Sequence, residues 1–600
     1  MNLSSGSARY LRQSKLFQSV SDEILDEIDP QPEFLSIKAG EVLIRQGDSG
    51  TDYYHLVSGR LRVFSELSNG KLKPLSEIYP GEGVGEMSLI TGEPRSATVI
   101  ARLDSEVIRV TQTALLKLIE RKPEMALQIA RMVTTRLAGQ QTQSTKNKTI
   151  AVLSLNVGVD GNAVAQDLAE QLSLFGGAEV LTANPSQPAD WQNLRDAEKR
   201  LSYAIYAAGP LDTDWARFCF LHADLLVLAV NAADEAPSGL IDLPFPRGVD
   251  RSLFGKVHLL MVHPHEWQRA CGTAAWIARL NPEEHHHVRA GQPKDFARLA
   301  RILADRAVNL VLSGGGARAF AQLGVLKALR KAGITFDRVA GSSMGAFVAA
   351  CYAYDGDFDS MILRMKESLV RRRPETDFTL PMLSLLRGKR LQEFGTDICG
   401  DWRIEDLPLR YFCLSSCLDD GESVSHFDGD VMLALRASCA FPVLGPPLLI
   451  DGKLLIDGGV LNNLPVDVMK QHFSGVVAAI DISAFEPLQM DSRWDRACPS
   501  GFDIFWSKFK PFSAALHAPN ILEILVRTLD MTCRAQIQRC RLQADWLIEP
   551  PVSDCKLTDF GLFDRMVEVG YQHGLTLLEE ITTQPDLARV RGVQDLVASC

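Results

Sequence analysis

The sequence has no long apolar run and no excess of positive charge. No stretch approaches the roughly 18–20 consecutive apolar residues of a transmembrane helix. The first residues, Met1 to Arg12, lack the apolar core of a secretory signal. The net charge of −11 at pH 7 argues against a nucleic-acid-binding protein. We therefore expect a cytoplasmic protein with no nucleic-acid partner, and peripheral membrane contact is left open.

Paired cysteines are also missing. The 12 cysteines include no C-x-x-C pair, and Cys413 and Cys417 have no second pair at zinc-ligand spacing. We interpret them as reduced thiols, many of them buried. The run His285-His286-His287 lacks an acidic partner at a ligand spacing, and adjacent side chains point in different directions. We predict a solvated loop there, and we expect neither a metal nor a cofactor.

The chain of 600 residues is too long for one hydrophobic core, and its 46% hydrophobic content is typical of globular proteins. Short apolar runs separated by turn glycines predict an antiparallel roll or barrel over residues 15–110, and the stretch after it is helical in spacing. From residue 149 onward, buried strands alternate with helices, which predicts α/β domains.

Two glycine-rich turns carry the clearest chemical signal. Ser313-Gly314-Gly315-Gly316-Ala317-Arg318 lies between a predicted strand and a predicted helix, where backbone N–H groups can hold an oxyanion. Gly341-Ser342-Ser343-Met344-Gly345 follows and fits a G-x-S-x-G turn that presents Ser343 as a nucleophile. One helix and one short strand separate the two turns. Both turns are therefore expected at the same edge of a parallel sheet.

Simpler interpretations of the first turn exist. It also fits a dinucleotide fingerprint, with Ala319 at the last glycine position and Asp337 at the acidic position. A tight turn without a ligand is a further alternative. The second turn disfavours both of these interpretations, because neither accounts for Ser343.

Asp457 is the candidate base for Ser343. It ends an apolar run and precedes Gly458-Gly459, so its carboxylate can lie at a strand end, and desolvation would raise its pKa. Asp451 is interpreted as a turn residue. A Ser-Asp-His triad that uses His472, His517 or His573 is an alternative mechanism. An alternative function is that of a non-catalytic regulator, in which the hydrolase domain binds a ligand without catalysis.

These motifs together resemble the patatin-like phospholipase family of Ser–Asp hydrolases, with Ala319 where the family usually has glycine. The resemblance implies an α/β domain with a mainly parallel sheet that acts on phospholipids or lysophospholipids without a catalytic histidine. It assigns Ser343 as the nucleophile and Asp457 as the base. It assigns the oxyanion loop to Gly314, Gly315, Gly316, Ala317 and Arg318.

The N-terminal roll resembles cyclic nucleotide-binding domains, and the pair of domains is similar to the neuropathy target esterase branch. The run from Gly85 to Thr98 fits a phosphate-binding cassette. Arg95 would pair with the cyclic phosphate, and Glu86 would accept from the ribose hydroxyl. The assigned nucleotide-binding residues are Gly85, Glu86, Arg95, Ser96 and Thr98. A cyclic nucleotide is thus a candidate effector.

The remaining segments are less specific. The turn after the strand at 149–155 is P-loop-like but lacks the lysine, so nucleotide hydrolysis is not expected there. An apolar segment, 378–386, with basic residues on both sides is either a membrane-contacting element or a core helix. We predict five regions: the nucleotide-binding-type roll 1–140, a linker 141–148, the degenerate α/β domain 149–305, the hydrolase domain 306–485, and an extension packed on it, 486–600.

Overall fold

The structure is a computed structural model of the 600-residue chain. It describes residues 33–66, 72–130, 148–156, 158–182, 201–209, 213–239, 255–265, 270, 272–354, 356–483 and 521–583, with isolated positions in 17–24, 194–200, 241–243 and 500–504. The predicted linker 141–148 lies outside the described residues except for Lys148. The chain forms two compact units, and the boundary between them passes through strands β13 and β14, which belong to one sheet.

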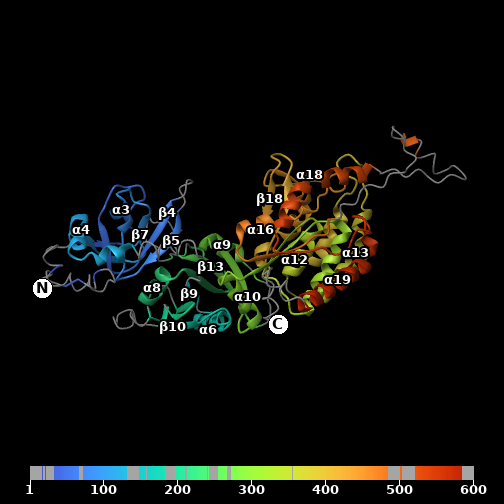
Figure 1. Ribbon diagram of the computed structural model, residues 1–600. Coiled ribbons are helices and arrows are strands. Elements are labelled where there is room, and N and C mark those ends of the chain that lie inside the picture. The colour runs from blue at the N-terminus through green and yellow to red at the C-terminus, as the bar shows by residue number, and fades with distance from the viewer. Residues whose placement is uncertain are drawn as a thin grey trace. The chain divides into compact units, whose positions relative to one another are not determined.

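The N-terminal part forms the predicted antiparallel roll. Two four-stranded sheets, ordered β1-β8-β3-β6 and β2-β7-β4-β5, enclose a core that includes Leu56, Leu61 and Val107. The short strands and their turn glycines favour this arrangement. The elements are β1 (Glu33–Ile37), β2 (Val42–Ile44), β3 (Tyr53–Ser58), β4 (Leu61–Glu66), β5 (Leu72–Ile78), β6 (Gly83–Val84), α3 (Glu86–Thr91), β7 (Thr98–Ala101), β8 (Ser105–Val110) and α4 (Gln112–Arg121) (Figure 1).

The middle sheet has the order β10-β11-β9-β12-β13-β14, and the pairs that join β10, β11, β9 and β12 are parallel. Strands β9, β11, β12 and β13 are buried and mainly apolar, as expected for a parallel sheet covered by helices. The elements are β9 (Lys148–Ser154), α6 (Gly161–Leu172), β10 (Ala178–Leu181), β11 (Tyr203–Ala208), α8 (Asp214–His222), β12 (Leu225–Asn231), β13 (Lys256–His263), α9 (Thr273–Leu280), β14 (Glu284–Arg289) and α10 (Pro293–Leu303).

Two details of this sheet bear on the sequence analysis. After β9, the Asp160 carboxylate caps α6 by accepting from the N–H groups of Asn162 and Ala163, so a carboxylate stands where a P-loop would hold phosphate. The solvated loop predicted for His285-His286-His287 is wrong. These residues lie within strand β14, and all three side chains are buried.

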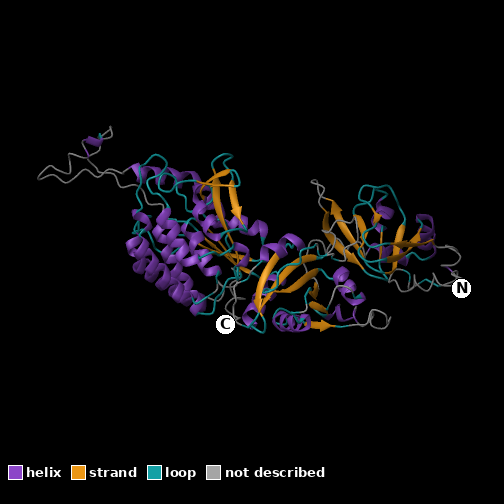
Figure 2. Cartoon of the chain, turned by 180° about the vertical axis from the view of Figure 1, so that it is seen from behind, coloured by secondary structure: helices purple, strands orange, loops and turns teal. Residues whose placement is uncertain are grey.

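The third sheet holds the two glycine-rich turns. Its order is β19-β20-β17-β16-β15-β21-β22, with β18 also paired to β17; the run from β17 to β22 is parallel, and β18, β19 and β20 are antiparallel. The predicted mainly parallel sheet is therefore confirmed. Figure 2 shows its strands flanked by helices.

The strands are β15 (Val308–Leu312), β16 (Arg338–Ser342), β17 (Arg410–Cys417), β18 (Ser423–His426), β19 (Leu448–Ile450), β20 (Lys453–Asp457), β21 (Val476–Ile480) and β22 (Trp546–Ile548). The helices are η3 (Gly316–Ala319), α11 (Phe320–Lys331), α12 (Met344–Ala353), α13 (Phe358–Arg372), η4 (Pro374–Thr376), α14 (Lys389–Cys399), η5 (Ile404–Asp406), α15 (Val431–Ser438), η6 (Gly458–Val460), α16 (Val466–His472), α18 (Ile521–Gln543), η7 (Phe560–Leu562) and α19 (Phe563–Thr583).

The described C-terminal residues complete this domain. Strand β22 extends the sheet beside β21, and helix α19 packs closely on α11. A Cβ atom at Gly570 would meet the Ala321 carbonyl, and one at Gly324 would meet the Val567 carbonyl, so both crossing points require glycine. Among the described residues, no helix combines the length and apolar character needed to cross a bilayer.

Candidate active site

Ser343 lies on a sharp turn between β16 and α12. Its backbone has φ 53° and ψ −132°, a conformation that a residue with a side chain seldom adopts. The turn is possible because its neighbours are small: a Cβ on Gly341 would meet the backbone of Gly345, and one on Gly345 would meet the Ser313 carbonyl. The Ser343 N–H donates to the Ser438 Oγ at 3.0 Å, which holds the turn in place.

Asp457 lies at the end of β20 and meets this serine. The Ser343 Oγ donates to the Asp457 Oδ2 at 2.6 Å, and the Gly459 N–H donates to the other carboxylate oxygen at 2.8 Å. Burial raises the pKa of Asp457 to about 7, although both hydrogen bonds act to lower it. The residues expected to act as nucleophile and base are therefore in direct contact. Asp451 forms the turn between β19 and β20, as predicted, with φ 50°.

The glycine loop after β15 lies against the serine. A Cβ on Gly314 would come within 2.8 Å of the Ser343 Cβ, so only glycine allows this approach. Two of the predicted donors are already engaged: the Gly314 N–H donates to Asn463, and the Ala317 N–H donates to the Leu557 carbonyl.

Gly315 and Gly316 differ from these two. Within the described part of the chain, no acceptor is bonded to the N–H groups of Gly315 and Gly316. The Arg318 guanidinium donates to the Cys555 carbonyl at 2.6 Å, so this side chain anchors the loop to the C-terminal segment. Sequence reasoning missed Asn463 and Leu557, although Asn463 stands in the run that follows Asp457.

A cavity of about 410 Å³ opens over these groups. Ser343, Asp457 and the three glycines of the loop line one part of it. Most of the remaining lining is apolar and includes Phe378, Leu386, Phe441, Leu448 and Phe560. A long acyl chain fits such a lining, with the ester placed at Ser343.

Comparison with known proteins agrees with this geometry. Residues 310–470 match the family model of patatin-like phospholipases. The chain carries a patatin-like phospholipase domain. Residues 34–122 match the model of the cyclic nucleotide-binding domain.

Two relatives are similar to this chain over most of its length. Patatin-like phospholipase domain-containing protein 7 of Rattus norvegicus is 29% identical over 91% of this chain and 45% of its own length. Lysophospholipase nte1 of Aspergillus niger is 27% identical over 96% of this chain and 43% of its own length. The chain thus spans less than half the length of these relatives.

The alternative mechanisms find less support in the patatin-like domain. His472 packs against Phe427, and His573 belongs to α19; neither lines the cavity. His517 lies outside the described residues. Asp337, which a dinucleotide site would need free, is buried, and its carboxylate pairs with Arg301 at 2.6 Å.

Segment 378–386, which we name the entrance loop, is not the core helix considered above. Its tip is exposed: Leu380 and Met382 are 76% and 85% accessible. Its base is tied to the wall of the patatin-like domain, because the N–H groups of Leu385 and Leu386 donate to the carbonyls of Val443 and Leu444. Phe378, Leu385 and Leu386 also line the cavity, so the exposed tip adjoins its entrance.

In the roll, part of the cassette lies around Arg95. The Arg95 guanidinium donates to the carbonyls of Asp52 (2.8 Å) and Gly85 (3.1 Å). Glu86 is buried at the start of α3, and Ser96 is exposed with its hydroxyl on the Met87 sulfur. Thr98 is buried in β7 and accepts from the Gln46 N–H. The structure brings Gly85, Glu86 and Arg95 together, whereas the Thr98 hydroxyl faces Gln46.

Proposed function

We propose that this protein is a serine esterase that hydrolyses acyl esters of phospholipids or lysophospholipids through a Ser–Asp dyad. The observation that carries the proposal is the 2.6 Å hydrogen bond from the Ser343 hydroxyl to the Asp457 carboxylate inside an apolar cavity. A nucleophile whose hydroxyl donates directly to a buried base needs no histidine between them.

The reaction follows from the positions of these groups. Asp457 accepts the proton as the Ser343 Oγ attacks the acyl carbonyl carbon, and the carbonyl oxygen gains negative charge. The N–H groups of Gly315 and Gly316 would stabilise that oxyanion, because those of Gly314 and Ala317 already donate elsewhere. Asp457 returns the proton to the departing alkoxide, and an acyl-serine remains. Asp457 then takes a proton from a water molecule as the water oxygen attacks the acyl carbon. The bond to the Ser343 Oγ breaks, the fatty acid is released, and Asp457 returns the proton to Ser343.

The substrate class rests on the cavity and on the relatives. An apolar lining suits an acyl chain, and the names of the two relatives refer to phospholipase and lysophospholipase activity. We further propose that the N-terminal roll binds a cyclic nucleotide and regulates this activity, and that the entrance loop contacts the membrane. The cytoplasmic location stays a prediction from the sequence.

The decisive test is labelling and turnover of the full-length protein. A fluorophosphonate probe should label the wild type once per chain, at Ser343. Ser343→Ala should lose both labelling and at least 1,000-fold of its turnover of lysophosphatidylcholine and p-nitrophenyl esters, on the order expected for loss of a covalent nucleophile. Ser360→Ala, which changes an exposed serine on α13, is the matched control. Undiminished turnover in folded Ser343→Ala would refute the proposal.

A further inference from the structure

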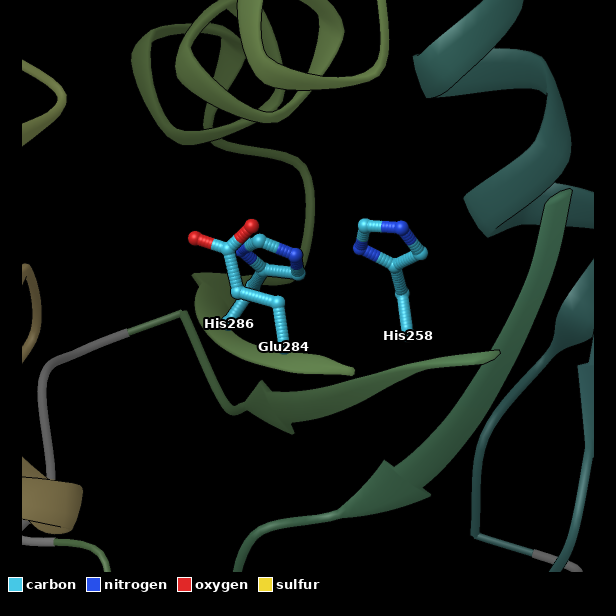
Figure 3. Close-up of side chains that lie close together, drawn as sticks. All are labelled: His258, Glu284 and His286. Atoms are coloured by element: carbon cyan, nitrogen blue, oxygen red, sulfur yellow. The ribbon is translucent and has the colours of Figure 1, made fainter. Parts of the chain in front are cut away.

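Two neighbouring strands of the middle sheet bring two histidines and a glutamate together. His258 lies on β13, and Glu284 and His286 lie on β14. One nitrogen or oxygen atom of each side chain lies within 4.8 Å of the others, and all three residues are buried. Figure 3 shows the three side chains rising from the same side of the two strands.

Strand geometry explains why this cluster could not be found by spacing along the chain. Successive side chains of a strand point to opposite faces, so Glu284 and His286 share one face. His285 and His287 face the other way: His285 lies 3.3 Å from the Arg410 guanidinium, and the His287 Nε2 lies 2.9 Å from the Glu405 carbonyl oxygen.

The pairing of the two strands supplies the third member. Strands β13 and β14 are neighbours in the sheet, and the Glu283 N–H donates to the Val257 carbonyl at 2.9 Å, which joins the start of one strand to the start of the other. The acidic partner that the histidine run lacks at a ligand spacing is thus Glu284, two residues before His286 on the same face. The second imidazole comes from the neighbouring strand.

We propose that His258, Glu284 and His286 bind one divalent transition-metal ion of the zinc class. Three atoms no more than 4.8 Å apart always share a point within about 2.8 Å of each, and zinc binds imidazole and carboxylate ligands at about 2.0–2.2 Å. Side-chain shifts of less than about 1 Å would therefore bring all three atoms to bonding distance, and water can take the fourth position of a tetrahedral ion.

The ligand types point to the same class of ion. Two imidazoles and a carboxylate favour zinc and its neighbours in the first transition series, whereas calcium and magnesium prefer oxygen ligands. A bound ion would join β13 to β14. This inference departs from the expectation of no metal that the sequence alone suggests.

Cobalt binding to the full-length protein tests the proposal. After treatment with EDTA, the wild type should bind one Co²⁺ per chain, with a visible d–d absorption band that Zn²⁺ abolishes by displacement. His258→Gln and His286→Gln should each weaken Co²⁺ binding at least tenfold, on the order expected for loss of an inner ligand. His265→Gln, which changes an exposed histidine close to β13, should bind as the wild type does.

A second measurement covers the case in which the variants fail to fold. X-ray absorption at the zinc edge of the wild type should report nitrogen and oxygen ligands with imidazole scattering. A shell dominated by sulfur would overturn the proposal, because it would place the ion on cysteines. Absence of stoichiometric Co²⁺ binding to folded wild type, or unchanged affinity in folded His286→Gln, would overturn it as well.

Discussion

Asp457 sets the expected pH dependence of the reaction. Burial raises the pKa of its carboxyl to about 7, and only the ionised form can accept the Ser343 proton. Turnover of a soluble p-nitrophenyl ester should therefore rise with pH and level off above an apparent pKa of about 7. Asp457→Asn should lower turnover about 100- to 10,000-fold, as loss of a general base does. Steady-state kinetics from pH 5 to about 9, the range set by this pKa, measure both effects.

The same carboxyl should affect stability in the opposite sense. Between its unfolded pKa of about 3.9 and its folded pKa of about 7, the native protein holds more protons than the unfolded chain. The free energy of unfolding should therefore fall as pH rises through this window. In Asp457→Asn this fall should be absent. Above the window, the free energy of unfolding of the variant should exceed that of the wild type by on the order of 1–3 kcal/mol. Asp451→Asn, in the exposed β19–β20 turn, is the control, and a parallel decline in Asp457→Asn would contradict the assignment.

At the residue scale, the sequence predicted which groups react. It did not predict which backbone N–H groups beside them are already hydrogen-bonded. The Ser343 and Asp457 motifs are local and depend on tight turns with small residues. The engagement of the Gly314 and Ala317 N–H groups depends on Asn463 and Leu557, which the fold brings from far along the chain. No local pattern reports such contacts.

Among the elements, the entrance loop has the clearest testable role. Its exposed apolar tip adjoins the cavity, and its basic neighbours Arg371 and Arg373 already pair with Asp397 and Glu375. Because those charges are partly neutralised, apolar insertion should dominate binding, at about 1.5–3 kcal/mol for each large side chain that leaves water. The double variant Leu380→Asp and Met382→Asp should lose at least tenfold in flotation with phospholipid vesicles and in turnover of vesicle lysophospholipid.

A soluble ester separates this role from catalysis. Leu380 and Met382 do not line the cavity, so turnover of p-nitrophenyl butyrate should stay within twofold of the wild type, on the order of changes at surface sites. Leu542→Asp, which places a charge at another exposed leucine on α18, should float as the wild type does. Equal flotation of the loop variant and the wild type would show that the membrane is contacted elsewhere.

Helices and strands with a clear pattern of apolar residues were predictable from the sequence, and those without such a pattern were not. The runs Val308–Leu312 and Phe320–Lys331 form the expected strand and helix because their apolar patterns are strong. Strand β14 was mistaken for a loop because it is buried on both faces. Its histidines, which look polar in sequence, show no alternation. The entrance loop is apolar yet exposed, so its composition suggested a core helix.

At the scale of the whole molecule, a buried charge network joins the roll to the middle sheet within the first compact unit. Arg60 and Arg102 lie in the roll and pair with Glu77. Arg102 also pairs, at 3.1 Å, with Asp224, the residue that precedes β12 of the middle sheet. The Arg60 guanidinium donates to the His222 carbonyl at 2.9 Å. Removing one partner of such a network leaves a buried charge unmatched, so the contact between the two parts should be destabilised.

Because the roll contacts the middle sheet, nucleotide binding by the roll is best measured on the full-length protein. The Arg95 guanidinium now donates to the Asp52 and Gly85 carbonyls, and a Cβ on Gly85 would come within 2.6 Å of it. A cyclic phosphate would replace neutral acceptors with a charged one, which strengthens each hydrogen bond. Calorimetry on the full-length protein should detect cyclic AMP or cyclic GMP binding. Arg95→Ala should weaken it about 10- to 100-fold, the equivalent of one charged hydrogen-bonded pair.

Two comparisons decide whether this binding regulates the enzyme. Arg45→Ala, which removes an exposed arginine of the same roll, should bind nucleotide as the wild type does. Saturating nucleotide should change turnover of lysophosphatidylcholine in the wild type and in Arg45→Ala, and leave Arg95→Ala unchanged. If folded wild type gives no binding heat with either nucleotide, the roll is a structural module and Arg95 serves only to join its loops.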